Sequence, residues 1–313
     1  MSNQSQFISC DWGTTNFRLR LVDRNSLEIL KEHKSTHGVK WLNNEAKRIG
    51  KAQEQVFFDF ITEQLSTSFP DWENVPMVCS GMLSSTLGLK ELPYAKMPLK
   101  TSGKDLITES IPLPNRKEIL LISGARGATG FMRGEEVQAI GLADDLTEDG
   151  ILILPGTHAK HLDFVGDQFT EMKNFMTGEL FSVLADHSIL ENSIRPSVWA
   201  DNYQVSFLDG VKLGLQDGCA THLLSVRSKQ MFESQAPQEG YFYLSGLLIG
   251  DELSYLKGKS DHIYLAAGEA TFPLYKLALE SFLDREQLTF FENATLRKSL
   301  FRGQRKILDI HGN

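Results

Sequence analysis

The sequence is poor in cysteine. Its 313 residues include three cysteines, Cys10, Cys79 and Cys219, which are far apart in the chain. An odd number of scattered thiols is neither a disulfide framework nor a zinc-binding pattern, and it is typical of a reducing compartment. We therefore expect a cytoplasmic protein with free thiols, and we expect Cys10 and Cys79, which fall on apolar strands, to be buried.

Long apolar runs and a basic excess are also missing. No stretch approaches the ~20 apolar residues of a membrane helix. The first six residues have neither the basic nor the apolar segment of a signal peptide, so none is expected. Acidic residues outnumber basic ones, 40 to 32, for a net charge of −8. This balance argues against a nucleic-acid surface. We expect neither a membrane nor a nucleic-acid partner.

The two common glycine-rich nucleotide motifs are absent. The glycines of the 124–130 segment recur at every third residue, which is not the G-x-G-x-x-G spacing of dinucleotide-binding folds. Gly258-Lys259-Ser260 lacks the upstream glycine of a P-loop. We interpret 124–130 as a flexible connection, and any nucleotide must be held by another device.

Apolar strands alternate with amphipathic helices along the chain, which indicates an α/β protein. The composition, 41% hydrophobic and 23% charged, is that of an ordinary globular chain. Predicted strands cover 7–10, 17–22, 75–79, 118–123, 151–154, 241–244 and 263–267. Predicted helices cover 45–68, 134–142, 177–189, 211–226, 247–256 and 273–282.

A polar turn between the first two predicted strands is suited to phosphate. It offers the Asp11 carboxylate, the small Gly13, the hydroxyls of Thr14 and Thr15, and Asn16. Glycine lets the backbone approach an anion, amides and hydroxyls donate to phosphate oxygens, and a carboxylate can hold Mg²⁺. The alternative is an ordinary hairpin turn.

A second strand and polar turn repeat this arrangement at 151–165. Gly156, Thr157, His158 and Lys160 follow the apolar strand 151–154, and Gly166-Asp167 then predicts a hairpin turn into a third strand. Thr157 and the turn amides can donate to phosphate, and Lys160 can neutralise charge. His158 is equally compatible with a structural role. Because the strand, polar turn and strand of the N-terminal segment recur here, we expect a long structural repeat without sequence repetition. Two such turns can face each other and hold a polyphosphate.

Together these segments resemble the superfamily of sugar kinases, actin and heat-shock chaperone ATPases, and within it the 2-dehydro-3-deoxygalactonokinase family. The resemblance extends over most of the chain, and the order of its segments is more specific than any one of them. Two departures are the stretch 83–90 and His161, where an aromatic residue such as tryptophan is expected. The matching segments are 11–16, 80–82, 91–94, 132–138, 154–160, 175–181 and 245–250.

The resemblance implies an α/β, two-domain actin-like ATPase (ribonuclease H-like) architecture with an interdomain active-site cleft. Domain 1–135 would carry the first phosphate hairpin and part of the sugar pocket. Domain 136–313 would carry the second hairpin and the adenosine pocket, with the final helix allowed to return to the N-terminal domain. ATP and Mg²⁺ are the expected cofactors, and Asp11 is the expected metal ligand.

Arg133-Gly134-Glu135-Glu136 is the expected catalytic segment. A kinase needs an acceptor for the hydroxyl proton and positive charge near the transferred group or a substrate carboxylate. Arg133 supplies the positive charge, and Glu135 and Glu136 supply the negatively charged acceptor groups. The segment is similar to the G-x-E-E-A element of exopolyphosphatases, where one glutamate is the base. The alternative is an acidic helix start favoured by the helix dipole. The residues do not decide between Glu135 and Glu136.

The remaining expected site residues fall into two groups. Ser245, Gly246 and Gly268 are expected where a strand meets a helix, the place of the adenosine pocket in the superfamily. Thr177 and Glu179 are assigned to the sugar, although Glu179 can also cap its helix. The sugar pocket is expected to use Ser80, Gly81, Met82, Glu91, Tyr94, Thr177 and Glu179.

The expected activity is transfer of the γ-phosphoryl group of ATP to O6 of 2-dehydro-3-deoxy-D-galactonate in galactonate catabolism. The open alternatives are a kinase for another keto-deoxy sugar acid and an exopolyphosphatase-like phosphohydrolase. A non-catalytic sugar sensor is disfavoured because Asp11, Thr14 and Lys160 are all present. The expected partners are the sugar acid and ATP, with a homodimer as the default oligomer.

Overall fold

The computed structural model describes residues 5–69, 72–113 and 116–312. By its internal contacts the chain divides into two compact units. The first contains Met1–Thr147, Phe164–Met172 and Ala294–Asn313, and the second contains Glu148–Asp163 and Lys173–Asn293. The predicted functional domains, divided after residue 135, stay a prediction.

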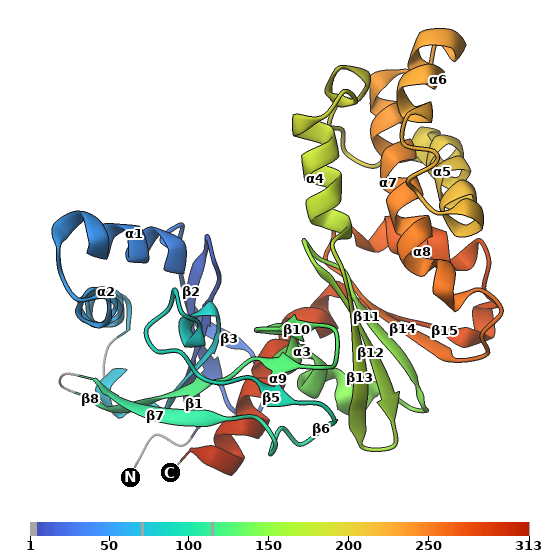
Figure 1. The fold of residues 1–313 in the computed structure, drawn as a ribbon. Coiled ribbons are helices and arrows are strands. Elements are labelled where there is room, and N and C mark those ends of the chain that lie inside the picture. Colours follow the sequence, from blue (N-terminus) through green and yellow to red (C-terminus); the bar gives the residue numbers. More distant parts are fainter. Residues whose placement is uncertain (1–4, 70–71, 114–115, 313) are drawn as a thin grey trace. The chain divides into compact units, whose positions relative to one another are not determined.

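The first unit is built on a six-stranded sheet with the order β3-β2-β1-β4-β8-β7 (Figure 1). Neighbours β1/β2, β2/β3 and β7/β8 are antiparallel, whereas β1/β4 and β4/β8 are parallel. The predicted strands that flank the first polar turn are therefore confirmed. The six strands are β1 (Gln6–Trp12), β2 (Phe17–Asp23), β3 (Ile29–Ser35), β4 (Met77–Gly81), β7 (Thr108–Leu113) and β8 (Arg116–Ile122).

A small second sheet in this unit joins β5 (Ala95–Lys96), β9 (Ala125–Arg126) and β10 (Phe131–Met132). The N–H of Gly127 donates to the carbonyl of Gly130 at 2.9 Å and closes the turn between β9 and β10. The interpretation of 124–130 as a flexible connection is therefore wrong, because the segment forms an ordered hairpin.

Helices α1 (Val39–Ile49) and α2 (Gln53–Ser68) pack on one face of the large sheet. We predicted one helix over 45–68, which is wrong, because Gly50 adopts a left-handed conformation with φ 68° and ends α1. This conformation favours glycine and terminates helices. The core under the two helices includes Trp12, Phe57, Cys10 and Cys79. The predicted burial of the two cysteines is therefore confirmed.

Helices α3 (Glu135–Leu142) and α9 (Asn293–His311) lie side by side in the first unit (Figure 1). Two glycines permit this contact: a Cβ on Gly141 would lie 1.8 Å from the Ser299 carbonyl oxygen, and one on Gly303 would lie 1.9 Å from that of Val137. The last helix of the chain is thereby fixed to the unit that holds the first strand.

The second unit contains the strands β11 (Gly150–Leu154), β14 (His262–Ala266) and β15 (Leu288–Phe291), the first part of β12 (Ala159–Val165) and the last part of β13 (Gln168–Phe175). The sheet order is β15-β14-β11-β12-β13-β6, in which β6 (Leu99–Lys100) pairs with Gln168 and Phe169, residues that belong to the first unit. Its helices are α4 (Thr177–His187), α5 (Gln204–Asp217), α6 (Ser225–Glu233), α7 (Pro237–Leu253) and α8 (Phe272–Glu280).

The two large sheets repeat one topology. The order β13-β12-β11-β14-β15 corresponds strand for strand to β3-β2-β1-β4-β8. In the first sheet β1 runs parallel to β4, and β4 runs parallel to β8. In the second sheet β11 runs parallel to β14, and β14 runs parallel to β15. The short turns within 150–175 require antiparallel neighbours, as in the first hairpin. This confirms the predicted α/β class and the structural repeat.

Two predictions in the second unit are wrong. The 241–244 segment is not a strand but part of α7, and the predicted helix 211–226 is divided between α5 and α6. Helix α7 is buried almost all round, so it lacks the one-sided apolar pattern that identifies a surface helix. Aromatic residues are common in β-strands, so Tyr241, Phe242 and Tyr243 led to the wrong prediction of a strand. Within the described parts of the chain, no helix is both long and apolar enough to span a membrane.

Candidate active site

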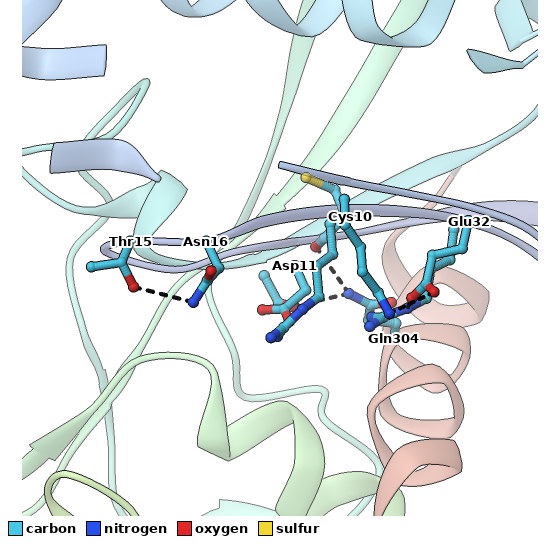
Figure 2. A network of polar contacts seen from close by, with 10 residues as sticks. Cys10, Asp11, Thr15, Asn16, Glu32 and Gln304 are labelled. Atoms are coloured by element: carbon cyan, nitrogen blue, oxygen red, sulfur yellow. Dashed lines mark hydrogen bonds and ion pairs between the residues drawn. The ribbon is translucent and has the colours of Figure 1, made fainter. Parts of the chain in front are cut away.

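The first polar turn connects β1 to β2 and presents its tip to solvent. The N–H of Gly13 donates to the carbonyl of Asn16 at 2.8 Å and closes the turn. Thr14, Thr15 and Asn16 are exposed. Figure 2 shows Asn16 donating to the Thr15 hydroxyl, at 3.2 Å. The predicted donors of this turn are thus accessible to a ligand.

Buried neighbours hold this turn in place. Trp12 is fully buried among aromatic rings, and its indole N–H donates to the carbonyl of His37 at 3.1 Å. The N–H of Val39, at the start of α1, donates to the Gly13 carbonyl at 3.1 Å. The turn is therefore anchored on its carbonyl side, which leaves its hydroxyl groups facing outward.

Asp11 forms an ion pair with Arg18, whose Nη1 lies 3.1 Å from Oδ2. The two residues are register partners across β1 and β2. Our sequence reasoning missed Arg18, although a hairpin with this turn length places it opposite Asp11. The Asp11 side chain is 28% exposed, so the carboxylate can still reach a cation from solvent.

Two glycines bring the expected catalytic segment, residues 133–136, to β1. Gly81, at the end of β4, is the register partner of Trp12 and has φ 87°. Gly134, just before α3, has φ 116°, and a Cβ placed on it would lie 3.5 Å from the Gly81 Cα. Positive φ values of this kind favour glycine. The structure therefore brings Gly81 and the start of α3 together next to the strand that carries Asp11.

Glu135 and Glu136 differ sharply in their surroundings. Glu136 is 1% exposed, and both of its carboxylate oxygens lie 2.8 Å from the Gly134 N–H that donates to them. Burial, with a smaller contribution from the neighbouring Glu135 charge, raises the pKa of Glu136 to about 8. Glu135 is only partly buried, and it accepts a hydrogen bond from the Arg133 N–H at 3.1 Å. Near neutral pH, Glu136 is therefore mainly protonated.

The Arg133 guanidinium fastens the loop that follows β4. Its Nη1 donates to both the carbonyl and the hydroxyl oxygen of Ser84 at 2.5 Å, and its Nη2 lies 3.4 Å from the Leu92 carbonyl. The guanidinium carbon lies 4.1 Å from the centre of the Tyr94 ring, within the range of a cation–π contact. Much of its hydrogen-bonding capacity is thus used within the protein.

The other expected sugar-site residues of the first unit are not equally accessible. Ser80 is buried, and its hydroxyl accepts a hydrogen bond from Gln304 of α9 at 2.9 Å. Figure 2 shows the same Gln304 amide reaching the Cys10 carbonyl, at 3.2 Å. Met82 is partly buried against the core, whereas Glu91 is exposed. The Ser80 side chain is thus used to anchor α9.

The second polar turn, between β11 and β12, also has an exposed tip. Gly156, Thr157 and His158 are exposed, but Lys160 is only 4% exposed. The Lys160 ammonium donates to the His158 carbonyl at 2.7 Å. We expected Lys160 to neutralise phosphate charge, which stays a prediction, and the structure places its ammonium beneath the turn. From there it still raises the electrostatic potential at the turn amides.

The start of α4 packs directly on this turn. The N–H of Glu179 donates to the Thr157 carbonyl at 3.0 Å, and a Cβ on Gly178 would lie 2.7 Å from the Gly156 carbonyl oxygen. The exposed side chains of His158 and Glu179 form a hydrogen bond between His158 Nε2 and Glu179 Oε2. The structure therefore joins Glu179, which we assigned to the sugar, to the second polar turn.

A buried polar network lies behind the same helix start. Glu252 of α7, 4% exposed, accepts hydrogen bonds from the Thr177 hydroxyl, from His161 Nε2 at 2.8 Å and from the Tyr275 hydroxyl at 2.8 Å. His161 Nδ1 lies 2.8 Å from the Tyr255 hydroxyl. Burial and the Glu252 charge raise the pKa of Tyr275 well above its ordinary value. Our sequence reasoning missed Glu252, because no local pattern connects these positions.

The expected adenosine residues have different positions. The premise for Ser245 and Gly246 is wrong: no strand ends there, and both lie inside the buried helix α7. A Cβ on Gly246 would lie 2.1 Å from the Phe207 carbonyl oxygen of α5, so this glycine serves close helix packing. Gly268 follows β14 as predicted, it is exposed, and a Cβ there would meet no atom within 4 Å. The assignment of all three to a nucleotide stays a prediction.

An open groove of about 720 Å³ adjoins the first turn within the first unit. It extends over β2, β3 and the helices α1 and α2, and we did not predict it from the sequence. Its lining combines aromatic, basic and hydroxyl side chains with one acid. Among the lining residues are Asn16, Arg18, Lys34, Ser35, His37, Trp41 and Glu63.

The chain has clear relatives. The sequence profile of the 2-keto-3-deoxy-galactonokinase family matches residues 11–301. A probable 2-dehydro-3-deoxygalactonokinase of Rhizobium meliloti (strain 1021) is 29% identical over 291 residues, covering 90% of this chain and 91% of the relative. The 2-dehydro-3-deoxygalactonokinase of Escherichia coli (strain K12) is 29% identical over 289 residues, covering 88% and 90%.

A solved structure has the same fold. It is the crystal structure of a Sinorhizobium meliloti protein with the provisional name 2-dehydro-3-deoxygalactonokinase. It superposes with a TM-score of 0.82 at 25% sequence identity, and the match covers 98% of this chain and 100% of the other. The matching profile begins at Asp11 and includes both polar turns and the Glu135–Glu136 pair.

Proposed function

This chain belongs to the 2-keto-3-deoxy-galactonokinase family, and we propose that it transfers the γ-phosphoryl group of ATP to O6 of 2-dehydro-3-deoxy-D-galactonate. Family membership makes it a sugar-acid kinase. The observation that carries the proposal is the match of this one family to nearly the whole chain, including both phosphate turns. What we propose beyond family membership is the identity of the nucleotide, the exact sugar acid and the hydroxyl group that is phosphorylated.

The surroundings of Asp11 fit a magnesium ion that arrives with phosphate. Mg²⁺ in phosphotransferases is commonly bound by one or two carboxylates, phosphate oxygens and water, rather than by an all-protein cage. Within the described ranges, no group of three or more His, Cys, Asp or Glu side chains is arranged to hold a metal, which suits such a site. Asp11 would hold the ion, which neutralises phosphate charge when bound.

The two turns supply donors for the phosphates. We assign the hydroxyls of Thr14 and Thr15, and the Asn16 amide, to phosphate oxygens at the first turn. At the second turn we assign the Thr157 hydroxyl and the backbone amides, with the buried Lys160 charge behind them. Charge-assisted hydrogen bonds of this kind are about twice as strong as neutral ones.

Glu135 is the proposed acceptor of the sugar hydroxyl proton. It is the more accessible member of the pair, whereas Glu136 is buried and mainly protonated near neutral pH. A proton acceptor must be ionised and reachable by the substrate. We propose that Glu136 instead fixes the Gly134 N–H and hence the start of α3.

A coupled ATP assay across a panel of keto-deoxy sugar acids, neutral sugars and polyphosphate tests the proposal. We expect magnesium-dependent turnover that is fastest with 2-dehydro-3-deoxy-D-galactonate, and a product phosphorylated at O6 by ³¹P and ¹³C NMR. Faster turnover of another keto-deoxy acid would identify a different substrate. Polyphosphate hydrolysis without sugar phosphorylation would contradict a kinase. The assay includes a neutral analogue because a kinase with a carboxylate-binding site should discriminate strongly against it.

A further inference from the structure

The small sheet of the first unit has one exposed, cationic face. Across its strands, Lys96 is the register partner of Arg126, and Arg126 is the register partner of Phe131. Side chains at paired positions lie on the same face of a sheet. All three are exposed, Phe131 by 62%. Their neighbours on the opposite face are almost fully buried, namely Ala95, Ala125 and Met132.

Lys96 and Arg126, the two cations of the row Lys96–Arg126–Phe131, have no compensating partner among the described residues. Over the described residues, neither Lys96 nor Arg126 forms an ion pair or a side-chain hydrogen bond. Adjacent strands are about 5 Å apart, and like charges directly opposite each other destabilise a sheet. An anion placed between the two side chains would relieve this repulsion.

The row adjoins the loop already assigned to the sugar pocket. Tyr94 lies 5.7 Å from Phe131 in an edge-to-face contact, and Arg133 covers the Tyr94 ring. A Cβ on Gly124 would lie 2.8 Å from the Tyr94 ring, so the ring rests on the strand that carries Arg126. Tyr94, Arg126 and Arg133 therefore share one face of this small sheet.

Arg133 is a poor candidate for the principal carboxylate ligand. Its Nη1 already donates twice to Ser84, and its other contacts hold Leu92 and Tyr94. Arg126 has its full fork of donors available, and a guanidinium can bind a carboxylate through two parallel hydrogen bonds. Lys96 adds a second, compact positive charge beside it.

We propose that Arg126 and Lys96 bind the carboxylate of the sugar-acid substrate and set its preference over neutral sugars. This inference rests on the proposed kinase function and adds to it the residues that determine specificity. Arg133 then acts as a positioning residue, because it holds the 84–94 loop and the Tyr94 ring next to the row.

The test compares steady-state kinetics of Arg126→Gln, Lys96→Gln and the double variant with those of the wild type. We expect each single variant to raise the KM for the sugar acid at least about 10-fold, the scale of one charge-assisted hydrogen bond. The KM for ATP should not change. With an analogue whose carboxylate is replaced by hydroxymethyl, all variants should match the wild type.

Lys31→Gln is the matched control, because Lys31 is an exposed strand cation elsewhere in the same unit. Arg126→Lys should restore part of the sugar-acid affinity. Circular dichroism checks that each variant is folded, as expected for exposed positions. An unchanged sugar-acid KM in the folded double variant would overturn the proposal and leave the kinase function intact. A wild type that phosphorylates no sugar acid would overturn both.

Discussion

The sharpest prediction concerns the buried Glu136 carboxyl and its partly buried neighbour Glu135. Because burial raises the pKa of Glu136 from 4.5 to about 8, the folded state retains a proton that the unfolded state has lost over this pH range. The unfolded state binds fewer protons, so the free energy of unfolding falls as the pH rises from about 4.5 to about 8. The change Glu136→Gln should remove this pH dependence.

The magnitude follows from the shift. At about 1.4 kcal/mol per pKa unit, a shift to about 8 sets a ceiling of about 5 kcal/mol. The Gly134 N–H supports the ionised carboxylate, and relaxation of the surroundings lowers the cost further. We therefore expect the wild type to lose about 1–3 kcal/mol relative to Glu136→Gln between pH 5 and pH 8.5.

Urea unfolding at four pH values between 5 and 8.5 measures this difference, with Glu135→Gln as the control. Glutamine has the shape of glutamate and can still accept from Gly134, so packing is preserved. Parallel pH curves for the wild type and Glu136→Gln would refute the reasoning, because they would mean that Glu136 is ionised in the folded protein at neutral pH.

Turnover measured on the same variants separates the two glutamates in function. Glu135→Gln should lose on the order of 10²-fold or more in kcat, the scale of general-base catalysis, while Glu136→Gln should retain most of its turnover. If Glu136 were the acceptor, the wild-type kcat would instead rise with pH through its deprotonation near pH 8. If both variants turn over like the wild type, Asp11 or Glu179 becomes the next candidate.

Three further predictions test the turns and the packing. Asp11→Asn should cut turnover on the order of 10²-fold with an unchanged circular dichroism spectrum, because it weakens the magnesium site; normal magnesium dependence would argue against this role. Glu252→Gln should lower the free energy of unfolding by about 2 kcal/mol, because one amide cannot accept all three hydrogen bonds, and a loss under about 0.5 kcal/mol in urea would contradict the network. Gly246→Ala should cost about 1–3 kcal/mol or more, because its methyl group would overlap the Phe207 carbonyl, whereas Gly268→Ala should be nearly neutral. Equal melting temperatures for these two glycine variants would disprove the close packing of α5 and α7.

Local patterns predicted the parts of the chain whose structure is decided locally. The two polar turns follow from the short apolar strands beside Gly13 and Gly156, and the helix predicted over 134–142 is present as α3. The expected repeat is present in the strand order. Register alone would also have placed Arg18 opposite Asp11. These features depend on neighbours within a few residues, which a sequence displays directly.

The remaining features depend on contacts between distant segments, which only the tertiary structure decides. Helix α7 is buried on all sides, so its sequence lacks a helical period, and we mistook 241–244 for a strand. The choice between Glu135 and Glu136 depends on burial, and the position of the Lys160 charge depends on how the turn covers it. The sequence alone determined the family and the position of the two polar turns, because both depend on contiguous residues. Folding decided which side chains are ionised, buried or accessible, because desolvation and pairing are properties of the packed chain.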